Sequence, residues 1–303
     1  MKELTELFSV CLNRYKNCAP CDSDTCQLGF YCRANNCLQG QCDRCMNHIQ
    51  WDASPQFHYS CSKITFQYIL RFFNRFASEI AYFVASIKSD YLREKIKLNV
   101  VSLGCGPGSE VYGFIKALRV IAPHIILDYQ GFDLNDVWRE AQQISKAVLS
   151  KTPHLIEFYL MNMFGGFHGF SEGKVDFLVL NYLLSDSQKY YHSDEDKIKF
   201  IDEIAQFVFD HDVKNILFND QSYYGKGELD SGVGMMLRLI KSLESWDLSI
   251  VSDLRYFPSD KYVPSTAWRT YKSDKLIFQP FPGNTFDINI SCCRSKQILI
   301  HID

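Results

Sequence analysis

The chain has 303 residues, of which 47% are hydrophobic and 22% are charged, and its formal net charge is −3. This composition excludes a disordered chain, and the charge excludes a strongly basic protein that clamps nucleic acid over its whole surface. The sequence contains no run of 18 apolar residues, and its acidic opening, Met1–Leu7, is unlike a signal peptide. We therefore expect a cytoplasmic protein without a membrane span.

Cysteines are concentrated at the start of the chain, where nine of the twelve precede residue 62. This segment has too few aliphatic residues to bury a core of its own, so it needs a cross-link, and in a reducing compartment a metal ion is the expected one. Eight thiolates would close two tetrahedral zinc sites. The candidate ligands are Cys18, Cys21, Cys26, Cys32, Cys37, Cys42, Cys45 and Cys61.

Two alternatives to zinc remain at this point. The spacing Cys37-x4-Cys42-x2-Cys45, with Cys61 later, also matches the plant-type pattern for a [2Fe–2S] cluster. Disulfides or reduced structural thiols are the other alternative, although nine cysteines cannot all pair with one another. The number of ligands favours zinc.

A helix is predicted directly after the cysteines, in a connecting segment that we place at residues 62–94. Aromatic and aliphatic side chains such as Tyr68, Phe72 and Phe76 recur there at helical spacing. We expect this aromatic stripe to pack on the following domain. The alternative is that Arg71 and Arg75, which alternate with it, face a phosphate-bearing substrate.

From residue 98 onward, strand-like and helix-like patterns alternate. This alternation predicts a doubly wound sheet of parallel strands, with a ligand site at the carboxyl ends of the strands. The predicted strands cover residues 98–103, 125–132, 155–159, 175–180, 215–218, 248–252 and 297–302, and the predicted helices cover residues 109–121, 137–149, 194–209 and 235–243.

A glycine-rich turn follows the first predicted strand, and an acidic residue ends the second. Glycines at 104, 106 and 108 let the backbone turn tightly and approach a ligand, while Asp133 can accept two hydrogen bonds from a ribose diol. The segments Gly104–Glu110 and Gly131–Asp133 resemble the S-adenosylmethionine-dependent methyltransferases of the seven-stranded Rossmann-like class. A related fold that binds another nucleotide is the alternative.

The resemblance implies a fold and a cofactor site. The expected fold is α/β, a doubly wound seven-stranded Rossmann-like sheet with a small cysteine-rich, metal-stabilised N-terminal module. We place the module at residues 1–61 and the S-adenosylmethionine-binding domain at residues 95–303. The implied cofactor contacts are Gly104, Cys105, Gly106, Pro107, Gly108, Glu110, Asp133, Leu134, Asn162, Met163, Asn181 and Tyr182.

The acceptor of the methyl group is harder to predict. Asn181 and Asp186 are the candidate catalytic residues, with His192 and Asp220 as further candidate bases. Enzymes that methylate amino groups of bases often carry Asp/Asn-Pro-Pro-aromatic after the fourth strand, and only Asn181 fits that pattern here. A metal-bound front suits a macromolecular acceptor, RNA in preference to protein. The alternative is a non-catalytic methyltransferase-like protein that binds a partner through its cysteines. The sequence leaves the oligomeric state open.

Overall fold

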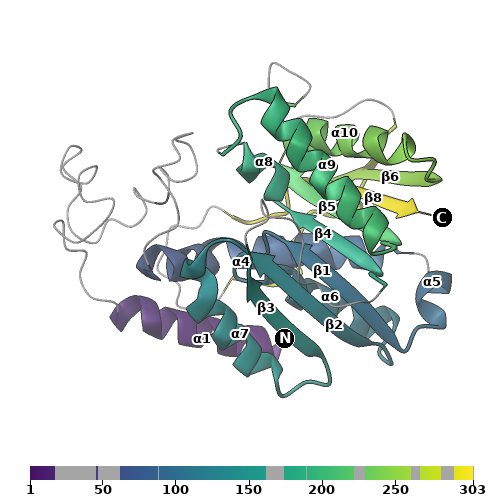
Figure 1. The fold of residues 1–303 in the computed structure, drawn as a ribbon. Helices are drawn as coiled ribbons and strands as arrows, with labels where there is room; N and C mark the ends of the chain where they lie inside the picture. The colour runs from purple at the N-terminus through teal and green to yellow at the C-terminus, as the bar shows by residue number, and fades with distance from the viewer. Residues whose placement is uncertain are drawn as a thin grey trace.

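The fold is a mixed α/β arrangement built around one large sheet (Figure 1). The computed structural model describes residues 1–17, 46, 62–87, 89–161, 174–188, 190–221, 229–260, 267–280 and 290–302. The sheet has eight strands in the order β3-β2-β1-β4-β5-β8-β6-β7. The strands are β1 (Lys97–Leu103), β2 (Ile126–Asp133), β3 (Leu155–Leu160), β4 (Phe177–Asn181), β5 (Asn215–Gln221), β6 (Ile250–Tyr256), β7 (Arg269–Thr270) and β8 (Ser295–Ile302).

Two expectations about the sheet need correction. The strand count is eight and not seven, because the two-residue strand β7 pairs with the end of β6. The pairing is parallel from β3 to β5 but antiparallel on both sides of β8. A parallel return needs a crossover such as a helix, and no helix lies between β6 and β8 in the described residues, so β8 enters the sheet in the opposite direction.

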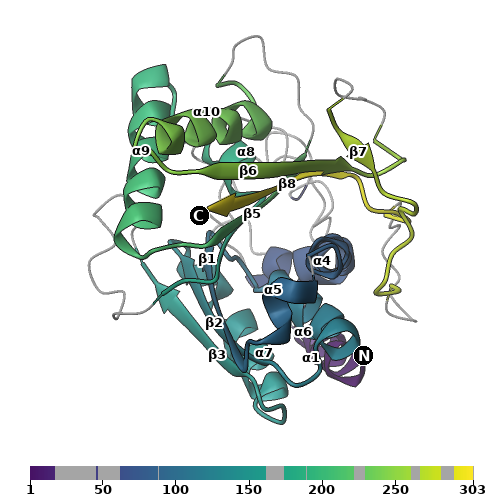
Figure 2. The ribbon, with the colours of Figure 1, turned by 90° about the vertical axis from the view of Figure 1, so that its right-hand side faces the viewer.

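Helices cover both faces of the sheet, as a doubly wound fold requires (Figure 2). One face carries four helices that share a hydrophobic core with the sheet: α1 (Lys2–Asn17), α4 (Ser62–Ala85), α6 (Ser109–Ile121) and α7 (Arg139–Leu149). The other face carries α8 (Leu183–Ser187), α9 (Asp194–Asp210) and α10 (Gly232–Glu244) around a second core. Two short elements, α5 (Ser89–Arg93) and the 3-10 turn η1 (Asp136–Trp138), complete the described secondary structure.

Local signals in the sequence set the ends of several helices. Ser193 caps α9 by accepting a hydrogen bond from the backbone N–H of Asp196, and three acidic residues occupy the first turn of that helix. Ser231 caps α10 in the same way, through the N–H of Gly234. Among the described residues, no helix is both long and apolar enough to cross a membrane.

Helix α4 is the predicted aromatic helix, and it packs against α6 more closely than ordinary side chains allow. A Cβ added at Gly113 of α6 would lie 2.7 Å from the carbonyl oxygen of Ala77 and 2.8 Å from Cβ of Ile80. Because glycine has no side chain, the two helices can approach one another and bury α4 along most of its length. This contact brings the aromatic and charged residues of α4 to the carboxyl ends of the strands.

Candidate functional site

The glycine turn after β1 has the shape that its sequence predicts. Gly104, Gly106 and Gly108 all have positive φ angles, between 51° and 78°, a region that other residues rarely adopt. The N–H of Gly108 donates to the carbonyl of Cys105 at 2.9 Å, which closes the turn. Gly104 and Gly106 are partly exposed while Cys105, Pro107 and Gly108 are buried, so the backbone of the first two glycines is what a ligand would meet.

Asp133 joins the end of β2 to this turn. Its Oδ2 accepts a hydrogen bond of 2.7 Å from the N–H of Gly106, and its Oδ1 accepts one of 2.8 Å from the N–H of Asn135. Burial raises the pKa of this carboxyl to about 6, so it is ionised at neutral pH. Each oxygen keeps a lone pair after these bonds, so the carboxylate can still accept hydrogen bonds from the two hydroxyls of a ribose.

An open pocket of about 190 Å³ adjoins Asp133. Its walls come from the end of β2, from α7 and from β3, and include Gln142 and the rings of Phe158 and Tyr159. Gln142 also donates to the carbonyl of Gly106 at 2.7 Å, so α7 supports the glycine turn while lining the pocket. Leu134 is 38% exposed and offers an apolar surface next to the carboxylate.

Two predicted cofactor contacts, Cys105 and Glu110, have buried side chains. Glu110 is completely buried and accepts hydrogen bonds from the hydroxyls of Ser102 (2.6 Å), Tyr129 (2.8 Å) and Ser109 (3.3 Å). Burial raises the pKa of the Cys105 thiol well above its ordinary value, so this residue is a packing group and not a nucleophile. In this structure both side chains support the turn from within the core.

The aromatic stripe of α4 is buried, as expected, and it packs against residues that follow β2 and β4. The ring of Tyr68 lies 5.2 Å from the ring of Trp138, and the ring of Phe76 lies 4.3 Å from that of Tyr182. Met46, which stands next to the predicted ligand Cys45, is buried in the same cluster. Met46 therefore contacts the aromatic stripe of α4.

Arg75 does not face a phosphate-bearing substrate, which was the alternative interpretation of its position in the sequence. It is only 9% exposed, its Nε lies 3.6 Å from Oε1 of Glu79, and its NH2 group donates to the hydroxyl of Tyr182 at 3.4 Å. The rings of Phe76 and Tyr182 lie within 6 Å of the guanidinium. Its charge is therefore balanced inside the protein, and Arg75 is not the phosphate-binding group that the alternative required.

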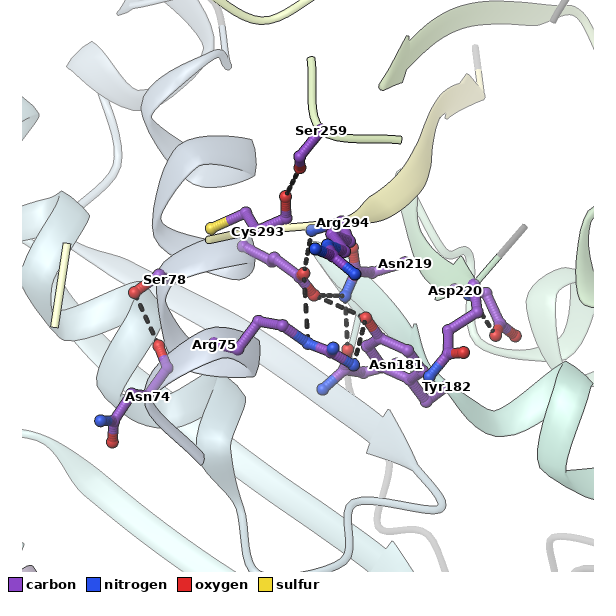
Figure 3. A network of polar contacts seen from close by, with 12 residues as sticks. Asn74, Arg75, Ser78, Asn181, Tyr182, Asn219, Asp220, Ser259, Cys293 and Arg294 are labelled. Carbon is purple, nitrogen blue, oxygen red and sulfur yellow. Dashed lines mark hydrogen bonds and ion pairs between the residues drawn. The ribbon is translucent and has the colours of Figure 1, made fainter. Parts of the chain in front are cut away.

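Polar side chains from α4, β4 and β5 meet at the carboxyl ends of the strands (Figure 3). Glu79 of α4 accepts hydrogen bonds from the hydroxyl of Tyr182 at 2.9 Å and from Nδ2 of Asn219 at 3.1 Å. Asn219 also donates to Oδ1 of Asn181 at 2.8 Å. Tyr182 has a φ of 58°, a left-handed conformation that costs energy for a residue with a side chain. The network holds this strained residue between β4 and α8.

The candidate bases occupy three different environments. Asp220 is completely buried, and it accepts hydrogen bonds from the N–H groups of Ser185 and Gln221, so it caps α8 and is not open to a substrate. Asp186 lies in the short helix α8 and is partly exposed. Burial, with the charge of Asp186 added to it, raises the pKa of Tyr190 to about 12. His192 is exposed after that helix. Of the three, Asp186 is the candidate that combines access with proximity to the site.

Several predicted residues lie outside the described part of the chain. They are Asn162 and Met163, together with all eight candidate metal ligands. Within the described residues, which exclude those cysteines, no group of three His, Cys, Asp or Glu side chains could hold a metal ion. Sequence reasoning missed Glu79, because a single glutamate within an apolar helix gives no local signal, whereas Asn219 was visible as the first residue of the polar segment 219–224 that could shape an acceptor pocket.

No family model matches this sequence, and no curated protein matches it. Solved structures with a similar arrangement include the plantazolicin methyltransferase BpumL in complex with SAH, at 13% identity and a TM-score of 0.45, covering 86% of this chain and 94% of that one. Magnesium protoporphyrin IX methyltransferase (ChlM) from Synechocystis PCC 6803 with bound SAM is 15% identical, with a TM-score of 0.41, covering 94% of this chain and 99% of that one. Human methyltransferase 10 domain containing protein is 8% identical, with a TM-score of 0.41 and coverages of 75% and 81%.

Proposed function

We propose that this protein binds S-adenosylmethionine and transfers its methyl group to a macromolecular acceptor. The observation that carries the proposal is the hydrogen bond from the N–H of Gly106 to the carboxylate of Asp133. It connects the acidic end of β2 to the glycine turn, with positive φ angles, that follows the neighbouring strand β1. The turn offers backbone at a close approach, and the carboxylate offers acceptors for a ribose diol. No phosphate-binding cation is needed for this ligand, which agrees with the internal pairing of Arg75.

The proposed chemistry is an in-line displacement. When bound, S-adenosylmethionine would supply a methyl carbon for attack by a lone pair of the acceptor, with the carbon–sulfur bond broken and S-adenosylhomocysteine as the leaving product. An acceptor that carries a proton must also lose it, and we propose Asp186 as the group that takes it, because it is partly exposed close behind Asn181. Asn181 then lies beside the methyl end of the cofactor.

Titration calorimetry with S-adenosylmethionine and S-adenosylhomocysteine tests the cofactor proposal. Wild-type protein is expected to bind both ligands, while Asp133→Ala and Gly106→Val abolish binding and leave the circular dichroism spectrum unchanged. Asp128→Ala is the matched control, because this acid lies five residues earlier on the same strand and pairs with Lys97 away from the residues that line the pocket. Equal affinity of the wild type and Asp133→Ala for S-adenosylmethionine would show that the cofactor does not bind at Asp133.

For the acceptor we propose RNA first and protein second. Met46 supports a role for the cysteine-rich segment in choosing the acceptor, because this neighbour of Cys45 packs against Phe72 and Phe76 of α4. Incubation of cellular RNA and protein with methyl-labelled S-adenosylmethionine tests the choice. Label that ribonuclease releases supports RNA, label that protease releases supports protein, and binding of the cofactor without any label favours a non-catalytic partner-binding protein.

We also propose that the cysteine-rich segment binds zinc, on the basis of its eight candidate thiolates. Elemental analysis of purified protein is expected to find about two zinc ions per chain. Iron with inorganic sulfide and a visible absorption band would instead support the [2Fe–2S] alternative.

A further inference from the structure

Glu79 determines which way a neighbouring amide faces. This carboxylate is completely buried, and a carboxylate offers only hydrogen-bond acceptors. Asn219 must therefore turn its Nδ2, and not its oxygen, toward Oε2 of Glu79, at 3.1 Å. The backbone N–H of Arg294 and the hydroxyl of Tyr182 also donate to this carboxylate, so donors surround it.

A second contact fixes Asn219 in the same orientation. Gln297 of β8 directs its Nε2 to the carbonyl oxygen of Glu79 at 2.9 Å, and a carbonyl is also only an acceptor. The same Nε2 donates to Oδ1 of Asn219 at 2.8 Å. Because both neighbours agree, the amide of Asn219 has one orientation, with its nitrogen toward α4 and β4.

The orientation of the Asn219 amide determines which end of the Asn181 amide is engaged in a hydrogen bond. Nδ2 of Asn219 donates to Oδ1 of Asn181 at 2.8 Å, so the oxygen of Asn181 is engaged (Figure 3). Its Nδ2 makes no hydrogen bond within the described part of the chain, and the side chain is partly exposed. In the parallel register Leu103 lies opposite Leu180, so Asn181 follows beside Gly104, the first glycine of the turn. The network thus presents an N–H donor next to the turn.

We propose that Asn181 donates this hydrogen bond to the carboxylate of S-adenosylmethionine, and that Glu79 and Asn219 are positioning residues that set its polarity. The inference rests on the proposed function. It takes the ribose to lie at Asp133 on β2 and the methionine end of the cofactor to lie at Asn181 on β4, the two strands that flank β1 in the sheet. The ammonium and the sulfonium at that end cannot accept a hydrogen bond from an amide, whereas the carboxylate can. An amino group would need the oxygen of Asn181, which Asn219 occupies.

The test compares S-adenosylmethionine with decarboxylated S-adenosylmethionine, which keeps the ammonium and the sulfonium. Asn181→Asp retains an oxygen for Asn219 and replaces the donor by a negative charge. Loss of a hydrogen bond to a charged group, with repulsion added, is expected to weaken S-adenosylmethionine roughly tenfold or more. The affinity for the decarboxylated ligand should be unchanged or higher. Asn13→Asp is the matched control, because Asn13 accepts the same kind of bond from Asn17 on exposed α1.

Glu79→Gln tests the positioning role. It replaces one acceptor oxygen by an N–H donor and so weakens one of the two contacts that orient Asn219, while the contact through Gln297 stays. The affinity for S-adenosylmethionine is expected to fall while that for the decarboxylated ligand stays, in protein whose melting curve shows that it is folded. If Glu79→Gln does not fold, Asn181→Asp still decides the inference. Equal affinity of Asn181→Asp and wild type for S-adenosylmethionine, or an equal loss for both ligands, would overturn it. Failure of wild type to bind either ligand would instead reject the proposed function.

Discussion

Replacing Glu79 by leucine should cost this protein much of its stability. Arg75 loses the partner of its ion pair, and three hydrogen-bond donors lose an acceptor: the hydroxyl of Tyr182, Nδ2 of Asn219 and the N–H of Arg294. Removing one partner of a buried ion pair typically costs about 3–5 kcal/mol, because the other charge stays in the interior. Each further buried donor without an acceptor costs about 1–3 kcal/mol.

The expected loss is therefore about 5 kcal/mol or more, against a total of about 5–15 kcal/mol for a typical protein. Urea denaturation followed by circular dichroism measures it, as the difference in the free energy of unfolding between the wild type and Glu79→Leu. If the variant is already unfolded without urea, its spectrum shows this directly.

A double variant separates the charge from the other contacts. Arg75→Met with Glu79→Leu removes the unpaired guanidinium, so it should be more stable than Glu79→Leu by about 3 kcal/mol. Glu157→Leu is a control, since this acid forms an exposed ion pair with Lys146 and its loss should cost below about 1 kcal/mol. A loss of less than about 1 kcal/mol in Glu79→Leu would refute the argument that Glu79 holds the network together.

Three further predictions concern titration and metal. Burial raises the pKa of Asp220 from 3.8 to about 7, so between those values the native state binds more protons than the unfolded chain. The free energy of unfolding should therefore fall as the pH rises from 4 to 7. Asp220→Asn should flatten this dependence in urea titrations at several pH values, and an unchanged slope would contradict the assignment. The pKa of Asp133 is about 6, and its charged form is the one that accepts hydrogen bonds from the ribose hydroxyls. Calorimetry should therefore show the affinity for S-adenosylmethionine falling by up to about tenfold per pH unit below pH 6. A constant affinity from pH 8 to 5 would count against this role of Asp133. A chelator should release metal and loosen the segment that carries the predicted ligands, seen as faster proteolysis before residue 62, and identical proteolysis with and without chelator would argue against a structural metal.

The sequence was sufficient to predict most of the sheet, the glycine turn and the acid that ends the second strand. Apolar runs at 98–103 and 215–218 became β1 and β5, because a strand buried on both faces needs apolar residues in succession. The turn at 104–108 and Asp133 were also visible, because glycines at positive φ and an acid at a strand end are local features. Their hydrogen bond followed from the parallel pairing of β1 with β2.

The network around Glu79 was decided by the tertiary structure. Glu79 and Arg294 are 215 positions apart, and Glu79 and Asn219 are 140 apart, yet both pairs are hydrogen bonded. No periodicity in the sequence records such contacts. They depend on α4 lying close to α6, which the absence of a side chain at Gly113 permits, and on β8 entering the sheet between β5 and β6.

The sequence by itself thus determined most of the elements, the glycine turn and the acid that ends β2, since hydrophobic spacing, glycine and charge act within a few positions of the chain. The tertiary structure alone decided that Arg75 is paired inside the protein, that Asp220 caps a helix, and that Asn181 presents its nitrogen beside the glycine turn. The direction of a hydrogen bond and the pairing of a buried charge depend on which groups meet in space, and only the folded arrangement of α4, β4, β5 and β8 brings those groups together.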